Sequence, residues 1–319
     1  MEQPNNVICG DCLEILPTLP AESVNLIFAD PPYNIGKAAW DKIPDYLGWC
    51  SKWIAECSRV LKPNGAFWVS HSKPLVLAKL SEMIAEHGRG LVNWVTWDKH
   101  FGKTFFYVPT RSFEPMAEHL IFHADEGEWT TQSDRTRGFI FEPLRAYLAG
   151  ERDRAGIANP AINAAWCAWK GVSSTSQTQK WFSNSCFNPP TREAYEWLRR
   201  LFNAQGGDFL RREYDDLRAE FEHLRYTFNN PGKVSSVWQI PLAKANGHET
   251  PKPEALLERI IKATSNPGDM VLDPFGGSGT TAAVASMLGR QFITIEQSEK
   301  WCGYIQQRVK ATRRSFFTR

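Results

Sequence analysis

Residues 270–296 constrain the fold most, because they combine four signals in a fixed order. An apolar strand pattern ends at Asp273, a loop with three glycines follows, a helical pattern comes next, and a second apolar strand ends in Glu296. This order is typical of the half of an open α/β sheet that binds a nucleoside at the carboxyl ends of its strands. It predicts parallel strands with a ligand at their carboxyl edge.

The glycine loop, Phe275-Gly276-Gly277-Ser278-Gly279, is not a phosphate loop of the Walker type, because no Gly-Lys-Ser/Thr follows it. Glu296, 23 residues after Asp273, is placed to hold ribose hydroxyls, and Phe275 offers an apolar face. A purely structural turn is the alternative, since tight turns also use glycine for positive φ. The whole unit favours a nucleoside cofactor. The expected contacts are Asp273, Phe275, Gly276, Gly277, Ser278, Gly279, Thr280 and Glu296.

The first hundred residues also alternate strand and helix patterns, which predicts a mixed, mainly parallel sheet with crossover helices. Strands are expected at residues 7–9, 24–29, 66–70, 91–97 and 119–123, and helices at 46–61 and 74–86. The middle of the chain has helical patterns instead, including one at 192–202 behind Thr191 and one at 210–224. We therefore expect residues 1–124 and 241–319 to form one α/β core, and residues 125–240 to form a mainly helical insertion.

Composition limits the setting but not the partner. A net charge of +2 does not by itself indicate a nucleic acid. Seven scattered cysteines predict no disulfide framework and a reducing compartment, so the cytoplasm is expected. No apolar run is long enough for a membrane span, and the first residues lack the pattern of a signal peptide. Cys9-Gly10-Asp11-Cys12 has the spacing of metal ligands, but no second pair completes a set, so no metal site is expected.

Asp30-Pro31-Pro32-Tyr33 follows directly on the expected strand at 24–29, and so lies at the carboxyl edge of the same sheet. At about 5% per residue type, four such positions arise by chance in roughly 0.002 of chains of this length. An aromatic amino group is a poor nucleophile, and Asp30 with the Pro31 carbonyl can accept its hydrogens. Proline stiffens the loop, and Tyr33 offers a flat ring for a flipped base. A rigid turn at the end of a strand is the structural alternative.

Together the two motifs resemble those of the amino-group DNA methyltransferases, in the arrangement called the β group. In that group the DPPY-type catalytic motif precedes the target-recognition region and the cofactor loop comes last, as in this chain. The similarity covers about residues 5–125 and 235–310. It implies a Rossmann-like methyltransferase core with circularly permuted motif order, S-adenosylmethionine as cofactor, double-stranded DNA as substrate, and direct methyl transfer to a flipped base.

The resemblance also implies roles for single residues. Ile8-Cys9-Gly10-Asp11 is similar to the family motif whose acid contacts the cofactor adenine, which implies that role for Asp11, with Cys12 beside it. The segment at 248–253 is similar to the family segment that walls the methionine end of the cofactor, which implies a cofactor contact for Lys252. Asp30 is expected to contact the cofactor as well as the target base.

Members of the family with aspartate first in the tetrapeptide usually methylate adenine N6, and those with serine first usually cytosine N4. The resemblance thus implies N6-adenine methylation, with N4-cytosine methylation as the alternative. Carbon-5 cytosine methylation is disfavoured, because its cysteine nucleophile follows a proline and no cysteine here does. An RNA or protein amino-group methyltransferase and a non-catalytic DNA-binding protein remain as rivals. The resemblance leaves a cognate restriction endonuclease and a homodimer open as partners.

Residues 155–191 contain no acid, so this segment could face DNA without repelling phosphate. Its short helical patterns are compatible with a reader of the helix-turn-helix kind, although helix packing would explain its tryptophans equally well. Trp40 is placed to close over the target base, with a core role as the alternative. His71 follows the strand expected to end at Ser70, near the same sheet edge as the tetrapeptide, and is expected to be a satisfied histidine rather than a site residue. The residues expected to contact DNA are Trp40, Arg145, Arg152, Arg154, Lys170 and Lys180.

Overall fold

The computed structural model describes residues 5–36, 41–99, 117–125, 142–183, 187–224, 227–229, 234–243, 247 and 250–317. The chain divides into two compact units. Unit 1 combines residues 1–125 with 226–319, and unit 2 contains residues 126–225. Target recognition by the inserted segment stays a prediction.

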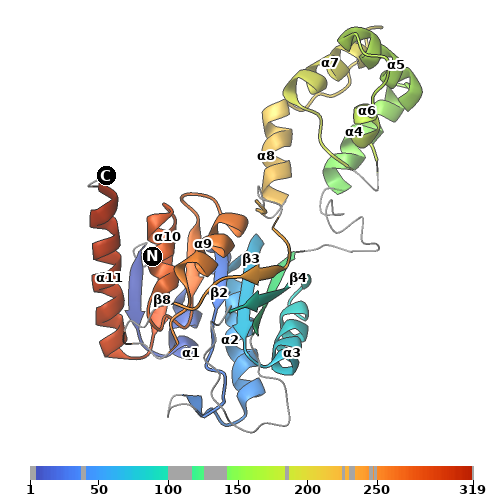
Figure 1. The fold of residues 1–319 in the computed structure, drawn as a ribbon. Helices are drawn as coiled ribbons and strands as arrows, with labels where there is room; N and C mark the ends of the chain where they lie inside the picture. The colour runs from blue at the N-terminus through green and yellow to red at the C-terminus, as the bar shows by residue number, and fades with distance from the viewer. Residues whose placement is uncertain are drawn as a thin grey trace. The chain divides into compact units, whose positions relative to one another are not determined.

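Unit 1 is built on one eight-stranded sheet in the order β1-β8-β7-β2-β3-β5-β4-β6 (Figure 1). The five strands from β1 to β3 in this order are mutually parallel, β5 is antiparallel to both of its neighbours, and β6 is parallel to β4. The predicted mixed, mainly parallel sheet is confirmed. The strands are β1 Asn6–Cys9, β2 Val24–Ala29, β3 Leu61–His71, β4 Arg89–Asp98, β5 Ala117–Asp125, β6 Val237–Gln239, β7 Met270–Asp273 and β8 Gln291–Glu296.

Successive residues of β2 point to opposite faces of the sheet, as the strand period of two requires. Leu26 and Phe28 belong to one buried cluster together with residues of α9, α10 and α11, whereas Ile27 and Ala29 belong to the other, with residues of α2 and α3. Both faces of the central strand are therefore covered, which explains its unbroken apolar sequence. The helices of unit 1 are α1 Cys12–Ile15, a 3₁₀ turn at Leu16–Thr18, α2 Tyr46–Val60, α3 Pro74–Ala85, α9 Glu254–Thr264, α10 Thr280–Met287 and α11 Glu299–Phe317.

The described part of unit 2 is helical and has its own core, as expected for the insertion, but unit 1 resumes at residue 226, so β6 belongs to the sheet and not to the insertion expected at 125–240. Trp166, Trp181 and Trp197 are buried in that core, so helix packing explains these tryptophans. Thr191 caps α7 by accepting from the Ala194 backbone N–H at 3.3 Å, as predicted. The helices are α4 Glu142–Arg154, α5 Asn159–Lys170, α6 Gln177–Lys180, α7 Arg192–Phe202 and α8 Tyr214–Leu224.

The helix predicted from residue 210 begins four residues later, at Tyr214. Leu210 has a φ of 53°, a left-handed value that no helix residue adopts, and its N–H donates to the buried carboxylate of Glu151 at 2.5 Å. A buried acceptor thus overrides the helical periodicity at this position, because an unsatisfied buried carboxylate would be costly.

Cys9 and Cys302 form a disulfide, so the prediction of unpaired cysteines is wrong for this pair. The two residues are 293 positions apart, and only the packing of α11 beside β1 brings them together. Because its sulfur is bonded to Cys302, Cys9 cannot serve as a thiolate ligand together with Cys12. Within the described ranges, no helix combines the length and the apolar character needed to cross a membrane.

Candidate active site

Four strand ends meet along the carboxyl edge of the sheet in unit 1. Because β1, β8, β7 and β2 are parallel neighbours, the residues that end or follow them share this edge. These residues are Asp11 after β1, Glu296 on β8, Asp273 on β7 and Asp30 after β2. The fold thus brings the tetrapeptide and the glycine loop together from opposite ends of the sequence.

Asp30 is held from both sides by hydrogen bonds. Its Oδ1 accepts from the Tyr33 hydroxyl at 2.8 Å and from Ser70 Oγ at 3.1 Å, and its Oδ2 accepts from Lys252 Nζ at 2.7 Å. Among the described residues, Lys252 is the one donor to Oδ2, so that oxygen retains a lone pair for a further donor. The carboxylate is both fixed in place and able to accept one more hydrogen.

The loop after the tetrapeptide is anchored at its base. The buried carboxylate of Asp41 accepts from the backbone N–H groups of Asn34 at 2.7 Å and Ile35 at 3.0 Å. The Tyr46 hydroxyl donates to the Pro32 carbonyl at 2.6 Å. These contacts set the direction in which the chain leaves the strand. Trp40, expected to close over the base, lies outside the described residues.

Lys252 joins the two halves of the site. Its ammonium contacts Asp30, while its backbone carbonyl accepts from Thr280 Oγ1 at 3.1 Å, at the first residue of α10. Its side chain is 9% exposed, so the ion pair is almost fully desolvated. Burial lowers the pKa of Lys252, but the carboxylates around it outweigh burial and raise the pKa well above its usual value. The lysine stays charged.

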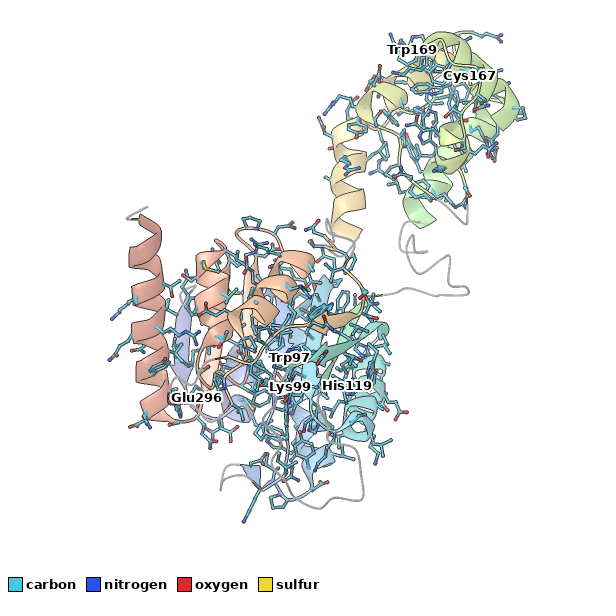
Figure 2. All side chains as sticks on the ribbon, in the orientation of Figure 1. Trp97, Lys99, His119, Cys167, Trp169 and Glu296 are labelled. Carbon is cyan, nitrogen blue, oxygen red and sulfur yellow. A yellow bond between two sulfur atoms is a disulfide. The ribbon has the colours of Figure 1, made fainter. Side chains whose placement is uncertain are left out.

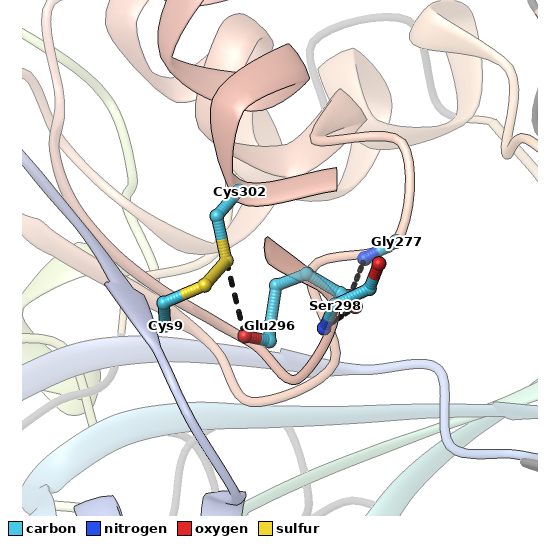
Figure 3. Close-up of a disulfide and its surroundings, with 5 residues drawn as sticks. All are labelled: Cys9, Gly277, Glu296, Ser298 and Cys302. Carbon is cyan, nitrogen blue, oxygen red and sulfur yellow. Dashed lines mark hydrogen bonds between the residues drawn. A yellow bond between two sulfur atoms is a disulfide. The ribbon is translucent and has the colours of Figure 1, made fainter. Parts of the chain in front are cut away.

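The carboxylate of Glu296 organises the glycine loop (Figure 3). One oxygen accepts from the Gly277 N–H at 2.7 Å and the other from the Ser298 N–H at 2.8 Å. The Glu296 carbonyl also accepts from the Gly10 N–H at 3.0 Å, next to the disulfide. The predicted ribose acid is therefore held by backbone donors on both oxygens, and each oxygen still has a lone pair for a hydroxyl.

Two glycines of the loop are required by close contacts. A Cβ at Gly276 would lie 2.5 Å from Thr294 Cγ2, and a Cβ at Gly279 would lie 2.7 Å from Ile305 Cγ1. Gly279 also has a φ of +73°. Phe275 packs against the rings of Trp49 and Trp53 at 5.6 and 5.3 Å between centroids. A glycine-free loop could not follow this path.

Asp11 and Cys12 occupy the start of α1. Asp11 Oδ1 accepts from the Leu13 N–H at 2.8 Å and caps the helix. Cys12 is buried, and burial together with Asp11 raises the pKa of its thiol to about 12. The thiol therefore stays neutral at the sheet edge, and no thiolate chemistry is available there.

Asp273 is buried at the end of β7, and its Oδ1 accepts from the Phe275 N–H at 3.0 Å. Burial raises the pKa of its carboxyl to about 7 from an ordinary 3.8. The folded protein thus binds more protons than the unfolded chain between these two values. The carboxyl therefore adds its whole contribution to the free energy of unfolding below pH 3.8, and this contribution disappears as pH rises toward 7.

Asp273→Asn is expected to remove this pH dependence, because the amide keeps the acceptor for Phe275 but does not titrate. The measurement is the free energy of unfolding in urea, taken for both proteins between pH 4.5 and 7.5. The wild-type value should fall relative to that of the variant as pH rises, by at most about 1.4 kcal/mol per pH unit. Parallel curves for the two proteins would contradict the assignment.

Three side chains that contact the candidate site residues are not among those expected from the sequence. Ser70 donates to Asp30, and Glu118 lies 3.5 Å from Lys252 through its Oε2. Arg308, in the C-terminal helix, donates to the Ser278 carbonyl at 2.9 Å and so braces the glycine loop. Strand direction brings Ser70 and Glu118 to the site, and the packing of α11 brings Arg308; the sequence pattern contains neither.

His71 lies against the site, with its ring 4.5 Å from that of Tyr33. Its Nδ1 accepts from the Lys73 N–H at 2.9 Å, and burial lowers the pKa of the imidazole to about 4. Its buried Nε2 has no hydrogen-bond partner in the described structure. The expectation of a fully satisfied histidine is therefore wrong for one of its two nitrogens.

Four of the five basic residues expected to contact DNA have partners for their side chains within unit 2. Lys170 Nζ lies 2.8 Å from each carboxylate oxygen of Glu193. Arg152 donates to Asp153 and Asn159, Arg154 pairs with Glu151, and Arg145 donates to the Phe182 carbonyl. Lys180 ends α6. Contact of these residues with DNA stays a prediction.

Comparisons with known proteins show the family of the chain. The family model described as DNA methylase matches residues 24–307. DNA adenine methyltransferase YhdJ of Escherichia coli (strain K12) is 28% identical over 310 residues, covering 94% of this chain and 80% of that protein. Type II methyltransferase M1.MboII of Moraxella bovis is 28% identical over 305 residues, covering 94% of this chain and 95% of that protein.

Solved structures are similar in fold. The M1.HpyAVI–SAM complex matches with a TM-score of 0.53 and 17% identity, covering 95% of this chain and 98% of that chain. PvuII DNA methyltransferase, described as cytosine-N4-specific, matches with a TM-score of 0.54 and 17% identity, covering 95% and 85%. The family model spans most of the sequence, and the motif order is that of the β group. The chain therefore belongs to the DNA methylase family and is a β-group amino DNA methyltransferase.

Proposed function

We propose that this chain transfers a methyl group from S-adenosylmethionine to the exocyclic N6 of adenine in duplex DNA. The observation that carries the proposal is the position of Asp30, whose Oδ2 keeps a lone pair at the sheet edge shared with the glycine loop. An acceptor for amino hydrogens beside a nucleoside-binding loop is the arrangement that this reaction needs.

The residues of the loop fit an adenosyl cofactor. Glu296 has lone pairs for ribose hydroxyls, and Asp11 has a second carboxylate oxygen for a donor on the base. Phe275 adds an aromatic surface beside Trp49. Acidic groups along the edge also suit a ligand that carries a cationic sulfonium. When bound, S-adenosylmethionine supplies an electrophilic methyl group.

The tetrapeptide prepares the nucleophile. Asp30 Oδ2 and the Pro31 carbonyl accept the two amino hydrogens, which strengthens the nitrogen lone pair and aims it along the line of transfer. The ring of Tyr33 stacks on a base that has left the helix. Transfer is direct, and no covalent bond forms between enzyme and substrate.

Adenine is favoured over cytosine by two observations. The tetrapeptide begins with aspartate, and the relative from Escherichia coli, similar along 94% of this chain, is named a DNA adenine methyltransferase. N4-cytosine methylation uses the same acceptors and is the second candidate. These acceptors do not discriminate between the two bases, because adenine and cytosine both carry an exocyclic NH₂ group.

We further propose that the insertion reads the target sequence. Lys180 would contact phosphate there, and Arg145, Arg152, Arg154 and Lys170 would do so after exchanging their present intramolecular partners. The name of the Moraxella bovis relative, a Type II methyltransferase, supports a cognate restriction endonuclease as a partner. A homodimer and a cytoplasmic location complete the proposal.

The test is single-molecule sequencing of DNA from cells that express the chain, with the Asp30→Ala variant as the reference. The expected result is N6-methyladenine at one short sequence with the wild type and none with the variant. N4-methylcytosine instead would select the second candidate. Unmodified DNA, together with cofactor and DNA binding by the purified protein, would select a non-catalytic DNA-binding protein.

A further inference from the structure

A second carboxylate, Glu118, lies beside the catalytic tetrapeptide. Its Oε2 is 3.5 Å from Lys252 Nζ and 3.3 Å from the Tyr33 hydroxyl. Its Oε1 is 2.5 Å from Lys99 Nζ. Lys252 therefore lies between two carboxylates, at 2.7 Å from Asp30 and 3.5 Å from Glu118.

Strand direction places this group at the site. β5 runs antiparallel to β3, so its first residues lie at the edge where the parallel strands end. Glu118 is the second residue of β5 and pairs with Trp97 of β4. Lys99 follows the end of β4 at the same edge, and Figure 2 shows Trp97, Lys99 and His119 close together there.

The two lysines and the two carboxylates sum to zero charge, and all four side chains are largely excluded from solvent. The side chains of Lys252, Glu118, Lys99 and Asp30 are 9%, 12%, 15% and 20% exposed. Burial raises the pKa of Glu118, but Lys252 and Lys99 outweigh burial and lower the pKa to about 2. Glu118 thus stays ionised beside Lys252 and Lys99, and removing its charge leaves a buried ammonium group without one of its partners.

We propose that Glu118 is a positioning residue that shares the charge of Lys252 with Asp30, so that Asp30 keeps acceptor strength for the target amino group. This inference rests on the proposed function. A lysine with Asp30 as its single partner would withdraw electron density from the oxygen that must accept the amino hydrogen. With Glu118 present, Lys252 can lengthen its contact to Asp30 Oδ2 as the base arrives and remain paired.

Glu118→Gln tests the inference because it keeps the size of the side chain and removes its charge. The expected result is a fall of about 10- to 100-fold in the single-turnover rate of methyl transfer, from the loss of one charge-assisted contact. Dissociation constants for S-adenosylmethionine and for duplex DNA should change less than about threefold, because the substitution leaves the glycine loop and the insertion untouched and the contacts of Glu118 are to Lys252, Lys99 and Tyr33.

Glu118→Asp separates charge from shape. If charge sharing matters, the aspartate variant is faster than the glutamine variant, although it is the poorer match in size. If the side chain merely fills space, the order is reversed. Glu258→Gln is the matched control, because Glu258 is also paired with a lysine, Lys262 at 2.5 Å, but on α9 away from the site. Its rate should equal that of the wild type.

Equal rates for the wild type and Glu118→Gln would overturn the inference and leave the proposed function intact. A wild type that transfers no methyl group would overturn the proposed function instead. Thermal unfolding of each variant shows whether it is folded. If Glu118→Gln does not fold, Glu118→Ala, which also removes the charge, carries the test with the same readouts, and an unchanged rate contradicts the inference.

Discussion

Asp30→Ala is expected to lower the single-turnover rate of methyl transfer to DNA by about 10²- to 10³-fold or more, the usual effect of removing one preorganised electrostatic contact to a reacting group. The substitution removes both acceptor oxygens and leaves Lys252 without its 2.7 Å partner. The measurement is a quench-flow assay with labelled cofactor at saturating enzyme. Binding of duplex DNA, measured by anisotropy, should persist because the substitution leaves the insertion intact.

Asp45→Ala is the control for this prediction. Asp45 is an exposed carboxylate that caps α2 by accepting from the Gly48 N–H at 3.3 Å, and its loss should cost about 1 kcal/mol of stability. Its transfer rate should stay within about twofold of the wild type, since that carboxylate contacts neither Tyr33 nor Lys252 in the described structure. A normal rate for Asp30→Ala would show that another group accepts the amino hydrogens.

Glu296→Ala is expected to weaken S-adenosylmethionine binding by about 100-fold. Two backbone donors, at Gly277 and Ser298, lose their acceptor, and each charge-assisted hydrogen bond is worth about 1.5–3 kcal/mol. The ribose loses its acceptor at the same time. Isothermal titration calorimetry measures the affinity directly.

Glu299→Ala provides the comparison for that affinity. Glu299 is an exposed acid in the first turn of α11, three residues after Glu296. Its removal should leave the cofactor affinity within about twofold, because the affected charge is solvated. Equal affinities for Glu296→Ala and Glu299→Ala would contradict the assignment of the ribose acid.

The sequence predicts most of the sheet well because the signals of its strands are local, but not β6, which lies in residues expected to belong to the insertion. β2 was predicted at the residues where it lies, since a strand buried on both faces is an unbroken apolar run. The sequence also predicts the glycine loop and the acid at the end of β8, because the tight loop requires glycine and the strand ends in a single acidic residue, Glu296. Parallel order then places Asp30 and Glu296 at one edge.

Other features depend on contacts that no local pattern records. Glu118 precedes an apolar run like many solvent-exposed acids, and only the antiparallel course of β5 takes it to Lys252. Cys9 and Cys302 are far apart in sequence and meet through helix packing. Trp166 and Trp169 lie three residues apart in one helix, yet one is 3% and the other 44% exposed. Periodicity alone does not distinguish them.

The central claim is that the joined tetrapeptide and glycine loop transfer a methyl group to an adenine amino group in DNA. The most direct measurement incubates the purified protein with duplex DNA and methyl-labelled S-adenosylmethionine, digests the product to nucleosides, and identifies the labelled one by mass spectrometry. We expect labelled N6-methyldeoxyadenosine with the wild type, and little or none with Asp30→Ala. Label on any other nucleoside, or no label in DNA, would contradict this claim.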